Sequence, residues 1–240
     1  MKKYLLGLGL IFGLISTTSA QQFSYGLKGG VNYTMGGEIR GERSGVNSNG
    51  EPNHWNGTAE GSSQIGFHGG AFLQVNFGKF FLRPEVVYTS IALKFDFPKY
   101  PTQYHTPKKA SLYEVQKFDI PFMIGYNVWG PVDIYAGPVY SNILSSTLEG
   151  EEVLDEVVAQ NTPINLQGGV KAEFGRFGLD LRYEHSLSTP ETQNLDLANG
   201  EYGVNRAYFE DSRINQVILS VIFKIGGPGL NEGRRRKACY

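Results

Sequence analysis

Residues 177–187 read FGLDLRYEHSL, in which apolar or aromatic side chains alternate one by one with small, charged or polar ones. A period of two is typical of a β-strand, because successive side chains of a strand point to opposite faces. In a soluble protein the apolar face of such a strand lies in a core. In a membrane barrel the apolar face lies against lipid, and the polar face lines the lumen. One strand is compatible with both environments, so the rest of the chain must decide.

Eight segments show this alternation. They cover residues 23–34, 64–77, 80–95, 113–128, 132–144, 164–174, 177–187 and 213–225. The second, fourth and sixth segments are followed by turns of a few residues, at 78–79, 129–131 and 175–176. The other connections are long and polar, and the first runs from about Met35 to Ser62. Short turns that alternate with long loops are typical of an outer-membrane barrel with periplasmic turns and extracellular loops.

One face of these segments collects almost all of the charged side chains. They are Lys28, Arg83, Glu85, Lys117, Asp119, Asp133, Lys171, Glu173, Asp180, Arg182, Glu184 and Lys224. Six of them are positive and six are negative, and Lys94 is the main exception on the opposite face. A charge that faces lipid at the bilayer midplane costs about 2–4 kcal/mol, which explains the exclusion. The pattern therefore predicts a paired charge network inside a barrel.

A soluble lipocalin-like barrel is the competing interpretation, because it has a similar number of strands. It requires an apolar interior and a charged exterior. Aromatic residues near the turns favour the membrane instead, since aromatic girdles mark the two membrane–water interfaces. They are Phe77, Phe80, Tyr126, Trp129, Phe174 and Phe177. We therefore predict an all-β fold, an eight-stranded antiparallel transmembrane β-barrel in the outer membrane.

The ends of the chain predict export. Residues 1–20 have two lysines, an apolar run and small residues up to Ala20, as in a signal peptide. The apolar run covers about twelve residues, whereas a spanning helix needs roughly 20. The barrel domain is expected over 21–226, followed by a basic periplasmic tail over 227–240 that we interpret as a dispensable extension. The net charge of −1 gives no indication of nucleic-acid binding.

Four segments carry a family resemblance: LRPEVVY (82–88), KFDIPFMIGY (117–126), IYAGPVY (134–140) and FGLDLRYEHSL (177–187). They resemble the Bacteroidetes-type outer-membrane β-barrel family, the PorT-like group, whose members are similar to small OmpX-like barrels. The resemblance implies an eight-stranded barrel in the outer membrane. It implies no settled activity, although PorT itself is linked to type IX secretion.

Three prolines test the strand assignment. Pro84, Pro121 and Pro138 lie inside predicted strands, where a missing N–H interrupts the ladder. Bulges or strand ends explain them. A phase slip near Gln116 and Lys117 predicts a bulge there, because Val115 and Phe118 cannot share a face under strict alternation.

The barrel size restricts the function. An eight-stranded lumen is only wide enough for side chains to fill it, so a wide porin is disfavoured and a narrow, low-conductance porin is an alternative. For catalysis the candidate group is His185 with Glu184 and Ser186, but adjacent residues of a strand point to opposite faces. We therefore expect no enzyme activity and no cofactor or metal.

The long loops are the expected functional surface. The candidate loop contacts are Trp55, Tyr104 and Tyr202, and an acidic run at 148–160 has no EF-hand register. We expect surface interaction or envelope integrity, with an accessory role in secretion as the alternative. The expected partners are outer-membrane lipid, lipopolysaccharide, a surface or secretion-system partner, and the barrel-insertion machinery, which recognises a terminal-strand aromatic such as Phe223.

Overall fold

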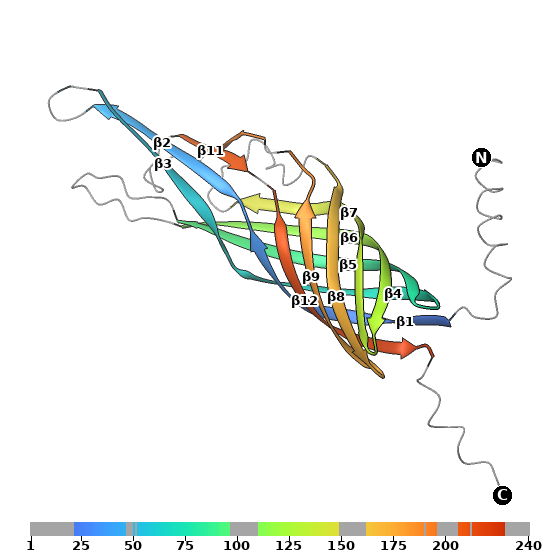
Figure 1. The fold of residues 1–240 in the computed structure, drawn as a ribbon. Helices are drawn as coiled ribbons and strands as arrows, with labels where there is room; N and C mark the ends of the chain where they lie inside the picture. The colour runs from blue at the N-terminus through green and yellow to red at the C-terminus, as the bar shows by residue number, and fades with distance from the viewer. Residues whose placement is uncertain are drawn as a thin grey trace, which may run out of the picture.

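The structure is a computed structural model that describes residues 22–46, 50, 52–96, 110–148, 162–189, 191–195, 206–211 and 213–228. These residues form twelve strands in one antiparallel sheet (Figure 1). The strands are β1 (Gln22–Met35), β2 (Glu38–Val46), β3 (Pro52–Ser63), β4 (Ile65–Phe77), β5 (Phe80–Asp96), β6 (Ala110–Trp129), β7 (Val132–Leu148), β8 (Ile164–Phe174), β9 (Phe177–Ser186), β10 (Gln193–Leu195), β11 (Arg206–Asp211) and β12 (Asn215–Gly226). Within these described ranges, no helix is long and apolar enough to cross a membrane.

Eight of the strands close into a barrel, in the order β1, β4, β5, β6, β7, β8, β9 and β12. Pairing of β12 with β1 and of β5 with β6 completes the circuit. Each barrel strand corresponds to one predicted segment. The largest difference in bounds, four residues, is at the end of β7, which runs to Leu148 instead of residue 144. The predicted eight-stranded antiparallel barrel is confirmed.

Three two-residue turns join β4 to β5, β6 to β7 and β8 to β9. Each begins with a glycine at positive φ: Gly78 at 64°, Gly130 at 53° and Gly175 at 61°. A tight hairpin that follows the strand twist needs this conformation, which glycine adopts without steric cost. These turns lie at the same end of the barrel as the start of β1 and the end of β12, which we call the turn end (Figure 1). The opposite end is the loop end.

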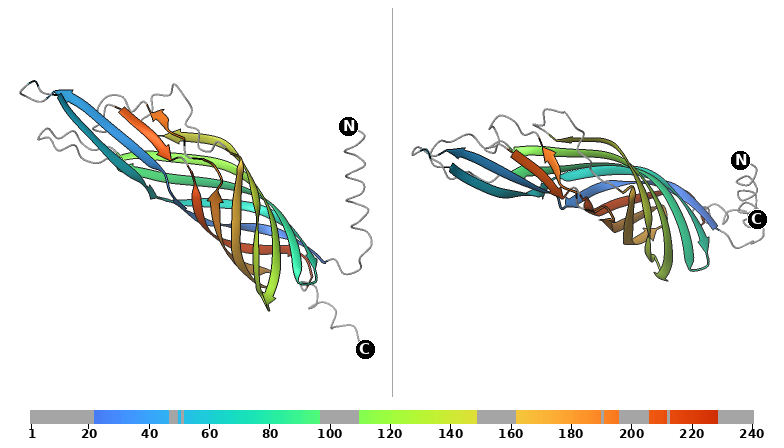
Figure 2. Two further views of the ribbon diagram at one scale, coloured as in Figure 1. Left: turned by 45° about the horizontal axis from the view of Figure 1, so that its top comes forward. Right: turned by 90° about the horizontal axis from the view of Figure 1, so that it is seen from above.

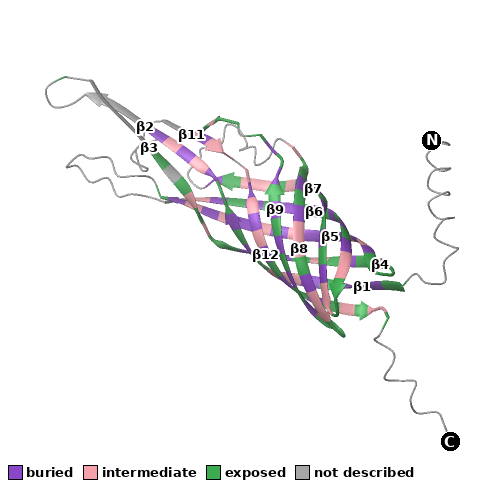
Figure 3. Cartoon of the chain, viewed as in Figure 1, coloured by how far each residue is buried: buried purple, intermediate pink, exposed green. Residues whose placement is uncertain are grey.

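Exposed and buried residues alternate along the barrel strands (Figure 3), and the exposed ones are largely apolar. In β9, Leu181 and Tyr183 are exposed, whereas Asp180, Arg182 and Glu184 are buried. Exposed apolar residues alternate with buried residues in the other barrel strands, and the buried ones include polar side chains as well as apolar side chains of β5 and β6. A continuous apolar exterior is unsuited to water and suited to lipid, which excludes the lipocalin-like interpretation.

The bulge predicted at Gln116 and Lys117 needs correction. The β6–β7 ladder does shift there, but the extra residue is Leu144 of β7, and β6 alternates without interruption. Val115 therefore faces inward and Phe118 outward. The phase slip was wrongly placed on β6, because the apolar residue Val115 was not expected on the inward face. The lumen becomes apolar toward the loop end.

The strands continue through the three prolines. Each proline lacks a register partner on one neighbouring strand. Pro84 has none on β4, Pro121 has none on β5, and Pro138 has none on β6. Each proline retains register pairs with its other neighbouring strand, as Pro84 does with Phe122 of β6. The barrel therefore tolerates the missing N–H groups as local ladder gaps.

Two connections that were predicted as irregular loops contain strands. β2 and β3 form a hairpin within the first connection, and β3 joins β5 through three pairs from Gly61 to Ser63. From the last connection, β11 pairs with β2, and β10 pairs with β11. We call β2, β3, β10 and β11 the β-extension. Figure 2 shows β2 and β3 reaching well beyond the loop end of the barrel.

Candidate functional site

All twelve charged side chains identified in the sequence project into the lumen. Ten are buried, and Glu173 and Lys224 near the turn end are partly exposed. The barrel brings them together as ion pairs, and we call this set the ionic network. It has three groups along the barrel axis: a turn-end group, a central group and a loop-end group.

The turn-end group is organised around Glu173 of β8. Lys224 Nζ lies 2.5 Å from Glu173 Oε2, and Lys171 Nζ lies 3.0 Å from Glu173 Oε1. Lys171 Nζ also lies 2.7 Å from Asp133 Oδ2 on the neighbouring strand. Arg83 Nη1 approaches Glu173 Oε1 to 3.4 Å and links this group to the next one. Three cations and two carboxylates therefore meet near the mouth of the lumen.

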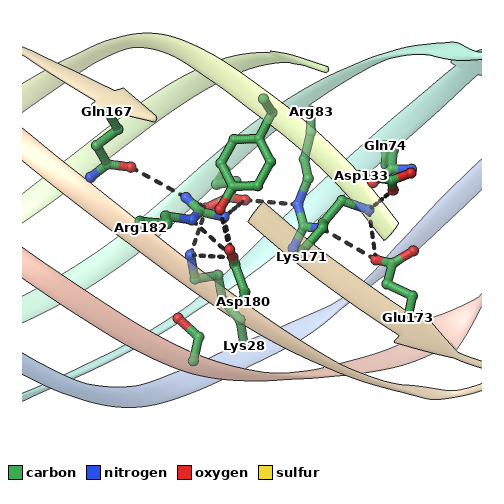
Figure 4. Close-up of polar contacts among 12 residues, drawn as sticks. Lys28, Gln74, Arg83, Asp133, Gln167, Lys171, Glu173, Asp180 and Arg182 are labelled. Carbon is green, nitrogen blue, oxygen red and sulfur yellow. Dashed lines mark hydrogen bonds and ion pairs between the residues drawn. The ribbon is translucent and has the colours of Figure 1, made fainter. Parts of the chain in front are cut away.

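Arg182 is the hub of the central group (Figure 4). Its Nη2 lies 2.6 Å from Glu85 Oε1 and 2.6 Å from Asp180 Oδ2. With bonds from Nε and Nη1 as well, the guanidinium donates five hydrogen bonds, which is its full capacity. Lys28 Nζ adds contacts of 3.0 Å to Glu85 and 3.7 Å to Asp180. Arg83 Nε lies 2.7 Å from Glu85 Oε1, but at an angle that makes no hydrogen bond.

The loop-end group is built on Lys117 of β6. Its Nζ lies 2.5 Å from Glu184 Oε1 and 3.2 Å from Asp119 Oδ1. Asp119 also accepts hydrogen bonds from Thr89 Oγ1 at 2.9 Å and from Ser141 Oγ at 2.6 Å. The Lys117 ammonium and both oxygens of Asp119 thus have protein partners in place of water, as buried charges require.

Gln167 of β8 connects the central and loop-end groups. Its Oε1 accepts a hydrogen bond from Arg182 Nη1 at 3.2 Å, and its Nε2 donates to Glu184 Oε2 at 2.5 Å. An amide suits this position because it supplies an acceptor on one side and a donor on the other. The ionic network is therefore continuous from the turn end to Lys117.

Aromatic rings pack against the central guanidinium groups. Arg83 lies 3.9 Å from the centre of the Phe72 ring, and Arg182 lies 4.9 Å from that of Tyr135. The Tyr135 hydroxyl donates a hydrogen bond to Asp180. Cation–π contacts of this kind are strongest where the cation is shielded from water. The lumen is therefore packed with side chains between its charges.

Above the ionic network, the loop end of the lumen is filled by an apolar cluster, which we call the apolar cap. Its buried members are Ile39, Ile91, Leu93, Phe95, Tyr113, Val115, Leu148, Phe209 and Ile214. Phe209 of β11 packs edge-on against Phe95 and Tyr113, at ring distances of 5.8 Å and 5.2 Å. The β-extension therefore contributes side chains to the closure of the barrel.

A charge-filled lumen inside an apolar cylinder is the arrangement of a protein that spans the outer membrane. Residues 19–189 match the family model described as the outer membrane protein beta-barrel domain. The chain belongs to this family. For this outer-membrane barrel, the turn end is periplasmic and the loop end is extracellular.

Two solved structures are similar to this outer-membrane barrel. Neisserial surface protein A shares 13% identity over 81% of this chain and 98% of its own, with a TM-score of 0.33. The TodX deltaS2S3 mutant, a monoaromatic hydrocarbon channel, shares 11% identity over 87% of this chain and 52% of its own, with a TM-score of 0.28. The chain thus spans about half the length of TodX. No curated protein matches it.

The apolar cap contains one phenol, that of Tyr113. The side chain of Tyr113 on β6 is fully buried. Its hydroxyl accepts a hydrogen bond from Ser146 Oγ at 3.2 Å. This hydrogen bond gives the buried phenol a polar partner.

The candidate catalytic group of the outer-membrane barrel does not assemble. Glu184 faces the lumen and is bonded to Lys117, whereas His185 faces outward, with Nδ1 3.0 Å from Asn215 Oδ1. Ser186 is on the buried side with Glu184. The three side chains therefore cannot act as one triad. Among the described residues, no group of His, Cys, Asp and Glu side chains is arranged to hold a metal ion.

The predicted loop contacts are largely beyond the described residues. Tyr104, Tyr202 and the acidic residues of 149–160 lie outside these ranges. Trp55 belongs to β3, where its backbone pairs with Arg43, but its side chain is outside the described part. Sequence reasoning missed the apolar cap. The available signal was weak: Ile39 and Phe209 are single apolar residues within short polar stretches.

Proposed function

We propose that this outer-membrane barrel is a closed, non-conducting and non-enzymatic protein that acts at the cell surface through its β-extension, in surface interaction or envelope integrity. The observation that carries the proposal is the filling of the lumen. The ionic network fills its middle, and the apolar cap fills its extracellular end. Ions crossing such a lumen would have to displace paired charges and then pass the largely apolar layer of the cap.

The β-extension is the ordered structure that remains available to a partner. β2 and β11 are held to the barrel through Ile39 and Phe209 of the apolar cap, and β3 is held through its pairs with β5. A rigid scaffold of this kind is a common support for binding residues. Lipopolysaccharide and other outer-membrane lipids are the expected surroundings of its base, and Trp55 is a candidate contact.

Planar-bilayer recording tests the closed lumen. Purified full-length protein should show little or no current, because the side chains of the ionic network and of the apolar cap fill the lumen. Large, long-lived openings that admit sugars would contradict the proposal and favour the porin alternative.

A shortened β-extension tests the surface role. Gly41 and Gly57 are paired across the β2–β3 hairpin, so residues 42–56 are replaced by the two-residue turn Asn-Gly. The barrel should still insert, while binding to the host or neighbouring cell surface, or resistance of the envelope to detergent, should fall. Unchanged binding and resistance in this variant would contradict the proposal.

The sequence resemblance to the PorT-like group supports a second candidate, an accessory role in a type IX secretion apparatus. Segments such as LRPEVVY and KFDIPFMIGY carry this resemblance. A pull-down from crosslinked outer membranes separates the candidates. Stable co-purification with secretion components would favour the second one, whereas recovery with the barrel-insertion machinery alone would favour the first.

A further inference from the structure

A small cavity lies between the central and loop-end groups of the ionic network. Its volume is about 10 Å³, which corresponds to the space of one water molecule. Lys28 and Arg182 of the central group line it, as do Thr89 and Asp119 of the loop-end group. Gln167, which bridges the two groups, lines the cavity as well.

His68 of β4 also lines the cavity and has an unused ring nitrogen. The residue is 95% buried, and its Nε2 lies 2.8 Å from Ser220 Oγ. Its Nδ1 is buried and has no hydrogen-bond partner among the described residues. A buried nitrogen without a partner is costly, so it indicates a ligand at this position.

The cavity offers both donors and acceptors. Lys28 Nζ donates one hydrogen bond, to Glu85, and Gln167 Nε2 donates one, to Glu184, so each retains N–H capacity. The lone pairs of His68 Nδ1 and of Thr89 Oγ1 are available as acceptors, because Thr89 donates its proton to Asp119. A ligand in the cavity must accept hydrogen bonds from Lys28 and Gln167 and donate hydrogen bonds to His68 and Thr89.

This combination discriminates between ligands of the same size. An anion would repel Asp119 and accept nothing from an unprotonated His68, and a cation would face Lys28 and Arg182. The ionic network is also balanced at six charges of each sign, so an added ion would leave a net charge in the lumen. A neutral molecule that both donates and accepts has no such penalty.

We propose that the cavity is a binding site for a single water molecule. The water donates to His68 Nδ1 and Thr89 Oγ1 and accepts from Lys28 and Gln167. His68 is then the neutral tautomer with its proton on Nε2, which donates to Ser220 Oγ. The water joins the central and loop-end groups into one hydrogen-bonded column. This inference is independent of the proposed surface role.

The site is tested on the full-length protein in detergent. In crystals that diffract to better than about 2 Å, an ordered water should lie within hydrogen-bond distance of His68 Nδ1 and of at least two other lining groups. A dry cavity, or an anomalous peak there after soaking with bromide, would overturn the proposal.

Nitrogen-15 NMR of the imidazoles tests the tautomer of His68. The variant His68→Gln assigns its signal among the four histidines, and the spectrum should find Nε2 protonated and Nδ1 unprotonated. A proton on Nδ1 would also contradict the proposal.

Two matched variants test the same site without removing a polar group. Val87 lines the cavity, and its neighbour Val86 is exposed on the lipid side. Val87→Ile should expel the water and lower the folding equilibrium constant roughly tenfold in urea titrations, since it overfills a packed interior. Val86→Ile adds the same methylene to the lipid face and should change the constant less than about twofold. Water retained in Val87→Ile, or equal effects of both variants, would contradict the assignment.

Discussion

At the scale of single residues, neighbours in one strand experience opposite surroundings. Leu181 is 47% exposed on the outer face of β9, and Arg182 is 2% exposed in the lumen. The backbone between them is the same extended chain, so the environment depends only on which face each side chain takes. Substitutions at the two positions should therefore destabilise the barrel for different physical reasons, and a second substitution in the lumen should rescue only one of them.

Leu181→Arg should destabilise the barrel by about 2–4 kcal/mol, because it places a cation against hydrocarbon near mid-membrane. Urea unfolding in lipid vesicles measures the effect. His185→Arg is the control, since this side chain is also outward but lies nearer the extracellular end of β9, where the expected cost is about 0–1 kcal/mol. A harmless Leu181→Arg would mean that the outer face does not contact lipid.

Arg182→Leu should cost about 3–5 kcal/mol for a different reason, the loss of a partner from a buried ion pair. Glu85 would keep Arg83 at 2.7 Å and Lys28 at 3.0 Å, whereas Asp180 would keep only Lys28, at 3.7 Å, among the ion pairs described. Adding Asp180→Asn should recover part of the loss, because it restores charge balance and still accepts from Tyr135. The same addition should not rescue Leu181→Arg. If the double variant is no more stable than Arg182→Leu, the charges are not coupled as described.

At the scale of elements, the apolar cap couples the β-extension to the barrel. β11 is six residues long and pairs along its length with β2, so hydrogen bonds to the barrel wall do not hold it. Its buried side chain, Phe209, contacts rings from β5 and β6 instead. Packing therefore takes the place of strand pairing at this junction.

Phe209→Ala should loosen the β-extension and leave the membrane barrel intact. Loss of a buried phenylalanine costs about 3–5 kcal/mol, and here the loss is confined to the cap. Limited proteolysis should cleave β2, β3 or β11 faster, while the heat-modifiable gel mobility of the barrel is unchanged. Tyr208→Ala is the control, because Tyr208 is on the opposite face and contacts Arg40. Equal proteolysis of both variants would show that the cap does not hold the extension.

At the scale of the whole molecule, closure of the barrel gives the backbone of every barrel strand hydrogen-bond partners on both sides. Each barrel strand has a neighbour on both sides, so no open edge faces lipid over the paired length. The outer surface is apolar, and the charges are enclosed and balanced. The stability of such a molecule depends on the membrane as much as on its interior.

The intact chain should therefore fractionate with detergent-soluble outer membrane and migrate faster in gels when it is not boiled. The closed hydrogen-bonded cylinder resists detergent until heating opens it, and the compact form moves faster. Recovery of folded protein from the soluble periplasmic fraction, with no mobility shift on heating, would contradict the barrel. A boiled aliquot of the same sample is the internal control.

Predictability from sequence differed between the barrel and its loop end. The eight barrel strands follow from alternation and from turns such as Gly78-Lys79, because both signals are local. The phase slip was placed on β6 because Val115 and Phe118 are both apolar, and an apolar residue alone does not indicate whether it meets lipid or an apolar cap. β10 and β11 were missed because short polar strands depend on neighbours for their stability, which no local pattern reports.

The sequence by itself determined the fold class, the eight barrel strands, the lipid-facing and lumen-facing sides of those strands and the charge balance of the lumen, because a period of two assigns alternate side chains to opposite faces. Only the tertiary structure decided which charges meet. Lys117 pairs with Glu184, 67 positions away, and Arg182 pairs with Glu85, 97 positions away. These partners, like the contact of Phe209 with Phe95, are set by barrel closure and strand register. Closure and register are collective properties of the whole sheet, and no single segment encodes them.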